Sequence, residues 1–221
     1  LSLDVLCYHN SYQAYIHGQR YGNFNSSGMI NTSTTESHFS APPLIEIQAI
    51  GEENLVYNLT NQYSITEGQV LETLAGVCDG RSITVSSGTY TLPNVTAVFQ
   101  PSDGSSYVDL PNSSFSYKPP PGTRQVIYRY KIHITADDSR GMAYFRLYVD
   151  DTDVTNFVRA WTGGDNGQDT LILDYTFEIG KTNDIANAKF LTWDTLKTIK
   201  LKVREHSANG HEVKIYSRGY W

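Results

Sequence analysis

Residues 126–134 read VIYRYKIHI, and this stretch decides the fold class of the 221-residue chain. Every second residue in it is apolar, from Val126 to Ile134, while Arg129, Lys131 and His133 occupy positions between them. A period of two is typical of a β-strand with one face in the core and the other in water. The sequence therefore predicts a half-buried strand here.

The same alternation returns in four later segments, at residues 144–149, 171–179, 199–204 and 213–216. Each of these segments has one apolar face and one polar face. Strands buried on both faces, as in parallel sheets, would instead read as continuous apolar runs. We therefore expect two antiparallel sheets packed face to face, an all-β sandwich.

The two parts of the chain differ in pattern, and we expect the boundary near residues 97 and 98. Residues 1–97 are predicted to form a smaller β- and loop-rich region, with a strand at 44–50 and one short helix near 67–78. Thr66 and Gln69 have the spacing of a helix N-cap, Gly80 could end the helix, and four apolar residues share one face, namely Val70, Leu71, Leu74 and Val77. Residues 98–221 are predicted to form the sandwich.

The charge distribution bears on the partners of the protein. Residues 1–97 carry a net charge of −6, whereas residues 98–221 carry equal numbers of acidic and basic side chains. An acidic or neutral surface does not attract phosphate backbones, which argues against nucleic acid as the main partner. No apolar run approaches the roughly 18 residues of a membrane span, so we expect none.

The residues that could catalyse a reaction or bind a metal do not have the spacing of a known catalytic or metal-binding motif. Asp150, Asp151 and Asp153 form one acidic cluster, and Asp165 with Asp169 forms another, but neither fits an EF-hand loop and Asp is common in tight turns. No HExxH motif, nucleophile elbow or phosphate-binding glycine loop occurs. We therefore expect a protein that is not an enzyme and has no metal or cofactor.

The two cysteines, Cys7 and Cys78, could form one disulfide, but free buried thiols are also common. Sequons for N-glycosylation occur in the first half of the chain, at Asn25, Asn31, Asn58, Asn94 and Asn112. A chain rich in Asn, Ser and Thr forms several sequons by chance, and a protein made in the cytoplasm would not meet the glycosylation machinery. Their occupancy stays open.

The solvent-exposed faces of the predicted strands carry the candidate binding residues. Ile127 and Ile172 interrupt polar faces and, with Tyr216, are candidates for a subunit interface, although single exposed apolar residues are normal. Tyr144, Arg146, Tyr148 and Trp161 are candidates for contact with a glycan or receptor, because aromatic rings beside cations can stack on sugars. The alternatives are a solvated strand face and a core position for Trp161. Antiparallel order also places the loops near 137–141, 162–169 and 206–211 at one pole of the sandwich.

Several motifs carry a resemblance to a known family. They are SFSYKPP at 114–120, QVIY at 125–128, FRLYVD at 145–150, WDTLKTIKL at 193–201 and the closing Tyr220-Trp221. With these motifs, residues 107–221 resemble the compact jelly-roll head of the tumour necrosis factor and C1q type, in the form found on viral fibres and capsids. LAGVCDG at 74–80 and SSGTYTL at 86–92 are similar to stretches that precede such heads in proteins of large algal and marine viruses.

The resemblance implies a homotrimer displayed on the virion surface, whose subunits pack through one sheet edge and aromatic faces. We therefore expect a virion structural protein, a minor capsid, penton or fibre head that contacts other capsid proteins and a host glycan or receptor. The alternative from another class is a secreted carbohydrate-binding module or lectin. A polysaccharide-cleaving enzyme is the third hypothesis.

Overall fold

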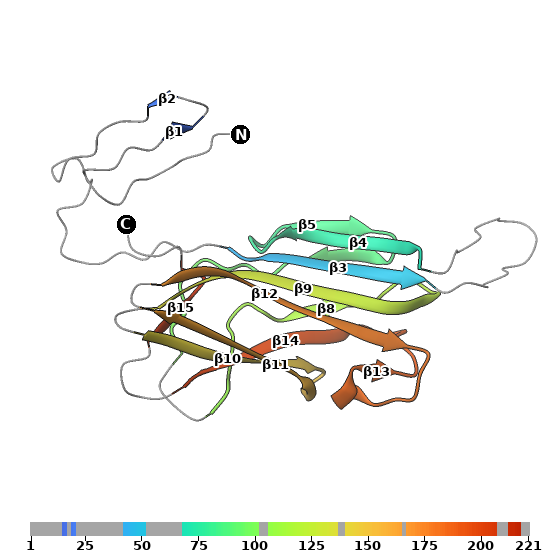
Figure 1. Ribbon diagram of the computed structural model, residues 1–221. Coiled ribbons are helices and arrows are strands. Elements are labelled where there is room, and N and C mark those ends of the chain that lie inside the picture. Colours follow the sequence, from blue (N-terminus) through green and yellow to red (C-terminus); the bar gives the residue numbers. More distant parts are fainter. Residues whose placement is uncertain are drawn as a thin grey trace, which may run out of the picture. The chain divides into compact units, whose positions relative to one another are not determined.

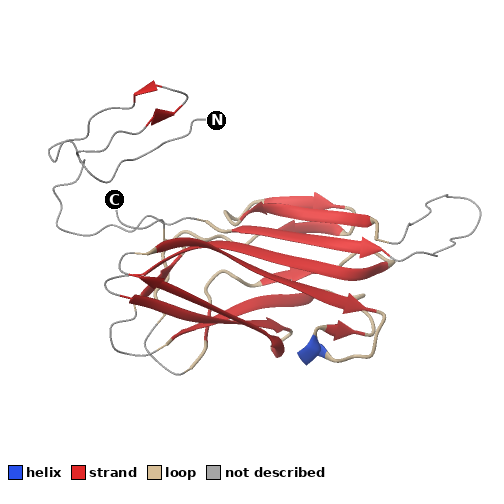
Figure 2. Cartoon of the chain, in the orientation of Figure 1, coloured by secondary structure: helices blue, strands red, loops and turns tan. Residues whose placement is uncertain are grey.

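The computed structural model describes residues 15–16, 19–20, 42–51, 68–101, 106–136, 140–164, 167–206 and 212–217. The chain divides into two units, one comprising residues 1–38 with 220–221 and the other residues 39–219. In the first unit, β1 (Tyr15–Ile16) and β2 (Gln19–Arg20) form an antiparallel pair. All other described elements belong to the second unit, which is nearly all β (Figures 1 and 2).

The first sheet of the second unit, here called the β9 sheet, is built around the longest strand. Its order is β13 (Lys189–Phe190), β12 (Gln168–Ile179), β9 (Thr123–Ala136), β3 (Leu44–Gly51) and β4 (Val70–Val77), and β15 (Val213–Ile215) also pairs with β9. All of these pairs are antiparallel except the short β12–β13 pair.

The second sheet, here called the β10 sheet, is also antiparallel. Its order is β11 (Thr152–Gly164), β10 (Arg140–Val149), β14 (Lys197–Glu205) and β7 (Val108–Asp109), and β8 (Phe115–Tyr117) also pairs with β14. A separate hairpin consists of β5 (Ser82–Val85) and β6 (Gly88–Thr91). The helical segment among the described residues is one 3-10 turn, η1 (Ile185–Asn187).

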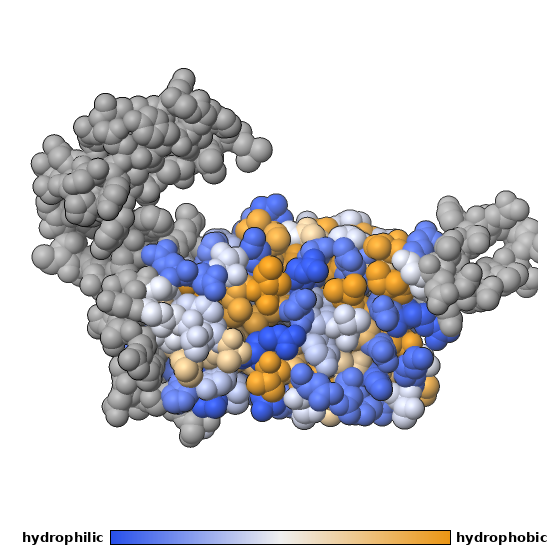
Figure 3. Space-filling view, in the orientation of Figure 1, coloured by the Kyte–Doolittle hydropathy of each residue, from blue (hydrophilic) through white to orange (hydrophobic). Residues whose placement is uncertain are grey.

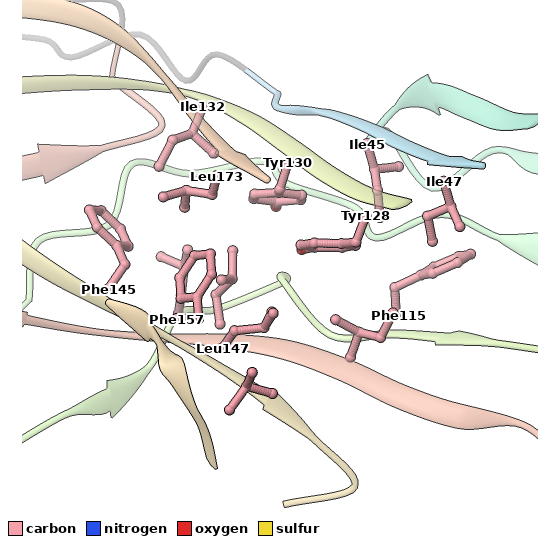
Figure 4. Close-up of a cluster of buried hydrophobic side chains, with 14 of the residues drawn as sticks. Ile45, Ile47, Phe115, Tyr128, Tyr130, Ile132, Phe145, Leu147, Phe157 and Leu173 are labelled. Atoms are coloured by element: carbon pink, nitrogen blue, oxygen red, sulfur yellow. The ribbon is translucent and has the colours of Figure 1, made fainter. Parts of the chain in front are cut away.

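The core lies between the two sheets and follows the predicted alternation. Val126, Tyr128, Tyr130, Ile132 and Ile134 of β9 are all fully buried. Opposite them, Phe145 and Leu147 of β10 point into the same core (Figure 4). The other alternate residues of β10 and β14 are also fully buried, namely Val149, Ile199, Leu201 and Val203. The predicted all-β antiparallel sandwich is confirmed, and the arrangement is consistent with a jelly roll.

The helix predicted near residues 67–78 is wrong, because residues 70–77 form strand β4. Here Glu72 and Leu74 are buried while Thr73 and Ala75 are exposed, which is the period of a strand. A charged residue at a buried position concealed that period in the sequence. Pairing of β4 with β3 along its length supplies the backbone partners, so tertiary context overrides the helical capping signals.

The boundary predicted at residues 97 and 98 does not coincide with the division into units. Strands β3 and β4 precede it, yet β3 pairs with β9 from Leu44 to Gly51 and so completes the same sheet. The predicted gathering of loops at one pole is seen in the described residues: Arg140 pairs with Gly164, Gln168 pairs with Thr135, and the His206 amide donates to the Met142 carbonyl. Among the described residues, no helix is long and apolar enough to cross a membrane.

Candidate functional site

The outer face of the β10 sheet gathers three of the four residues predicted to contact a ligand. Because Phe145, Leu147 and Val149 point into the core, the alternate residues of β10 point outward. These are Tyr144, Arg146 and Tyr148, and all three are half-buried. The register sets each beside a cation of β14: Tyr144 beside Arg204, Arg146 beside Lys202, and Tyr148 beside Lys200. We call this surface, completed by Tyr107, the tyrosine–cation face.

The cations of this face lie over the tyrosine rings. The Arg204 guanidinium carbon is 4.4 Å from the centroid of the Tyr144 ring and 5.3 Å from that of Tyr107. The Arg146 guanidinium carbon is 5.5 Å from the Tyr107 centroid, and Lys202 Nζ is 4.8 Å from that of Tyr148. Such cation–π contacts contribute about 0.5–1 kcal/mol each at exposed sites. These contacts place the cations over the faces of the tyrosine rings.

Carboxylates border the same cations. Lys200 Nζ is 2.6 Å from Asp151 Oδ1, and Lys202 Nζ is 3.4 Å from Asp109 Oδ1. The hydrogen bond between Lys200 and Asp151 raises the pKa of the lysine and lowers the pKa of the carboxyl. Arg146 Nη1 lies 3.3 Å from Asp153 Oδ2, while Arg146 Nε has no hydrogen-bond partner among the described residues.

Arg204 differs from the other three cations in its partners. The described residues place no carboxylate within ion-pair distance of its guanidinium, which lies between two tyrosine rings and makes one long contact, 3.5 Å from Nη1 to the Glu205 carbonyl. The tyrosine–cation face thus carries three cations that pair with carboxylates, the tyrosine hydroxyls, and one cation, Arg204, without an ion-pair partner among the described residues.

The predicted ligand contact at Trp161 is wrong for this structure, because Trp161 is buried at the pole of the sandwich with 6% of its surface exposed. Its Nε1 donates to Asp169 Oδ2 at 3.2 Å. Its ring lies against Gly141 and Gly163, where a Cβ atom would overlap it. The ring therefore packs in the core and does not stand beside Arg146.

The pole also carries a polar surface pocket of about 370 Å³ next to Asp169. Its lining is His133, Ile134, Gln168, Asp169, Thr170 and Ser217. Thr170 Oγ1 lies 3.2 Å from His133 Nδ1, so these side chains satisfy one another. His133 and Asp169 are the titratable residues of this lining.

The residues predicted for a subunit interface separate into two environments. Ile172 is 48% exposed on the outer face of the β9 sheet, and Ile127 is half-buried on the same face. Tyr216 is only 1% exposed, and its hydroxyl donates to the Pro111 carbonyl at 2.8 Å. The interface prediction for Tyr216 is therefore wrong: its backbone turns at a φ of 64°, which ends the strand alternation and directs the ring into the core.

The β9 sheet carries a row of three exposed apolar residues and one lysine that the sequence did not reveal. The register aligns Ile172 of β12, Lys131 of β9, Leu44 of β3 and Val77 of β4 across four adjacent strands. Leu44 and Val77 are 40% and 36% exposed. Figure 3 shows apolar patches interrupted by polar residues on the visible surface of the molecule. We call these four residues the Ile172 row.

A buried carboxylate, Glu72, is the polar group that sequence reasoning missed. It accepts hydrogen bonds from the Ser86 hydroxyl at 2.6 Å, from the Ser87 amide at 2.7 Å, from the Ser87 hydroxyl at 2.6 Å and from the Tyr117 hydroxyl at 2.8 Å. Burial raises the pKa of Glu72, but these hydrogen bonds outweigh it, so the pKa is lowered. A lone Glu within the apolar run of 70–77 was the only signal available.

The remaining predicted groups fall partly outside the described residues. Asn94 and Asn112 are exposed, whereas Asn25, Asn31, Asn58 and Cys7 are not described. Cys78 is fully buried as a free thiol, and burial raises its pKa to about 12. Within the described residues, no group of three His, Cys, Asp or Glu side chains could hold a metal ion. Asp150 lies 3.3 Å from Lys197 Nζ and caps the Thr198 amide, a structural role.

Known proteins show little similarity to this chain. No family model and no curated protein matches the chain. One solved structure is similar to the chain, titled "The 2.6A structure of Infectious Bursal Virus Derived T=1 Particles". The match covers 84% of this chain and 51% of the chain in that structure, at 11% sequence identity and a TM-score of 0.26. The chain thus spans about half the length of that capsid structure, and the likeness carries no argument about function.

Proposed function

We propose that this protein is a structural component of a virion surface, a minor capsid, penton or fibre head that assembles as a homotrimer with a β-sandwich head. The observation that carries the proposal is the Ile172 row on the outer face of the β9 sheet. The resemblance of residues 107–221 to viral jelly-roll heads supports the virion location, contact with other capsid proteins and contact with a host receptor.

Three of the four residues in the Ile172 row are apolar, and Lys131 lies between Ile172 and Leu44. Adjacent strands lie about 4.8 Å apart, so the row extends for roughly 15 Å across the sheet. Ile172, Leu44 and Val77 expose apolar surface that the monomer does not bury, because the inner face of the same strands already fills the core. The next row supplies a polar border, where Arg129 Nη1 lies 2.8 Å from Glu46 Oε2. Exposed apolar side chains bordered by polar groups are typical of subunit contacts.

The solution mass of the purified chain tests the proposal. A trimer would have about three times the chain mass of 24.8 kDa, which sedimentation or light scattering resolves readily. A chain that stays monomeric at all accessible concentrations overturns the proposal. A monomer that binds a neutral sugar would instead support the carbohydrate-binding module, and product release from an algal polysaccharide would support the enzyme.

A further inference from the structure

We propose that the tyrosine–cation face of the β10 sheet binds an anionic polysaccharide, one whose sulfate or carboxylate groups are separated by hydroxyl-bearing carbons. This inference goes beyond the proposed assembly role and holds whether or not the chain forms a trimer. It rests on the positions of four cations, three tyrosines and their neighbouring carboxylates on one outer face.

The spacing of the cations suits a linear polyanion. Lys200, Lys202 and Arg204 are alternate residues of β14, so their side chains leave the same face at intervals of roughly 7 Å. Arg146 stands beside Lys202 on the neighbouring strand. The four cations therefore form a stripe along one strand and a short branch across it, over which a chain of spaced anions could lie.

The cation–π contacts decide which kind of sugar fits. Lys202 covers the Tyr148 ring and Arg204 covers the Tyr144 ring. A neutral sugar that stacks on either ring would have to displace the cation first. An anionic group meets a cation that the ring already holds in place, so less conformational freedom is lost on binding. The face therefore favours an acidic glycan over a neutral sugar stacked on the rings.

Arg204 is the strongest anchor for such a ligand. It has no ion-pair partner among the described residues, and its planar guanidinium matches the oxygens of a sulfate or carboxylate in a bidentate contact. Arg146 adds a second, half-buried guanidinium at the same surface, with its Nη1 atom 3.3 Å from Asp153 Oδ2.

The carboxylates of the tyrosine–cation face favour a polysaccharide over a nucleic acid as its ligand. Asp109 and Asp151 lie beside Lys202 and Lys200, so the stripe is not uniformly positive. A polymer with one negative charge at every repeat and few hydrogen-bond donors would be repelled by these carboxylates. A polysaccharide offers hydroxyl donors between its acidic groups, and these can bond to Asp109 and Asp151 while the acidic groups meet the cations.

Binding of a sparsely sulfated dextran sulfate, in which free hydroxyls lie between the sulfate groups, tests the inference, with unsulfated dextran as the neutral control on the same backbone. We expect the full chain to bind dextran sulfate, to lose affinity as salt is raised, and to show no binding of dextran. The double variant K202Q/R204Q should bind roughly tenfold or more weakly, since two charge-assisted contacts are lost. The matched variant K181Q/K189Q removes two exposed lysines away from the face and should bind as the unmodified chain does.

A second variant examines the positioning of Arg204. Y144L keeps the arginine and removes the ring beneath it, so we expect weaker binding of dextran sulfate with an unchanged far-UV spectrum. Equal affinity for dextran, equal loss in K181Q/K189Q, or tighter binding of single-stranded DNA would each overturn the inference. A trimeric mass without dextran sulfate binding would overturn this inference alone, whereas a monomer that binds it would overturn only the proposed assembly.

Discussion

Glu72 accepts four hydrogen bonds in a site where 7% of the residue is exposed. E72Q keeps the side-chain size but offers one acceptor oxygen and an NH₂ group to the same donors. We expect its free energy of unfolding, measured in urea, to fall by about 2–3 kcal/mol. E46Q removes a half-buried carboxylate that pairs with Arg129 at the surface and should cost less than about 1 kcal/mol. Equal losses in both variants would contradict a special role for Glu72.

The same carboxylate makes stability depend on pH. Its pKa is lower in the folded chain than the ordinary value of 4.5, so the folded chain binds this proton less readily than the unfolded chain. Its stabilising contribution is therefore complete above about pH 4.5 and is lost as the pH falls through the folded pKa. Urea unfolding between pH 7 and pH 3 should show a smaller decrease for E72Q than for the unmodified chain. Parallel curves would refute this assignment.

Gly163 and Gly164 provide a matched pair beside Trp161. A Cβ at Gly163 would overlap the Trp161 ring, which is held by its hydrogen bond to Asp169 and by contact with Gly141. A Cβ at Gly164 would meet nothing within 4 Å. We expect G163A to lower the thermal midpoint, through an overpacking cost of about 1–3 kcal/mol, and G164A to leave it nearly unchanged. A midpoint shift that is equal in the two variants would show that the ring moves freely.

At the scale of elements, the β5–β6 hairpin depends on its turn being held by Glu72. Ser86 and Ser87 form this turn, and the Ser87 hydroxyl also lies 2.9 Å from the Tyr90 hydroxyl. We expect S86A/S87A to reduce hydrogen-exchange protection of β5 and β6 by roughly tenfold while β9 and β10 keep theirs. S82A alters an exposed pair with Thr91 in the same hairpin and serves as control. Loss of protection throughout the sandwich would instead indicate global destabilisation.

At the scale of the whole molecule, substitutions on the two sheets test the proposed assembly through the outer face of the β9 sheet. I172K places a second cation beside Lys131 in the Ile172 row, and we expect it to shift the solution mass from trimer to monomer, because adjacent buried like charges oppose association. V158K is the matched control: Val158 is 47% exposed, close to the 48% of Ile172, but it belongs to the β10 sheet. Monomer formation by V158K and not by I172K would place the interface on the other sheet.

The inner and outer residues of each strand could be predicted from the sequence, since alternation is local. The alternation predicted that Tyr128 and Tyr130 lie in the core and that Tyr144, Arg146 and Tyr148 share one outer face. It could not show that Arg204 lies over Tyr144, because that contact follows from the pairing of β10 with β14 across about sixty residues of chain. The same limit hid Glu72, whose partners lie 14, 15 and 45 residues away.

The period along each segment thus determined that the chain is an antiparallel sandwich and which side chains line its core, because apolar residues at alternate positions can be buried only in an extended backbone. Strand pairing decided everything that requires two segments at once: β4 in place of a helix, the Ile172 row, the cations over the tyrosine rings and the burial of Trp161 and Tyr216. Register and packing between distant segments are properties of the folded chain, and no local pattern contains them.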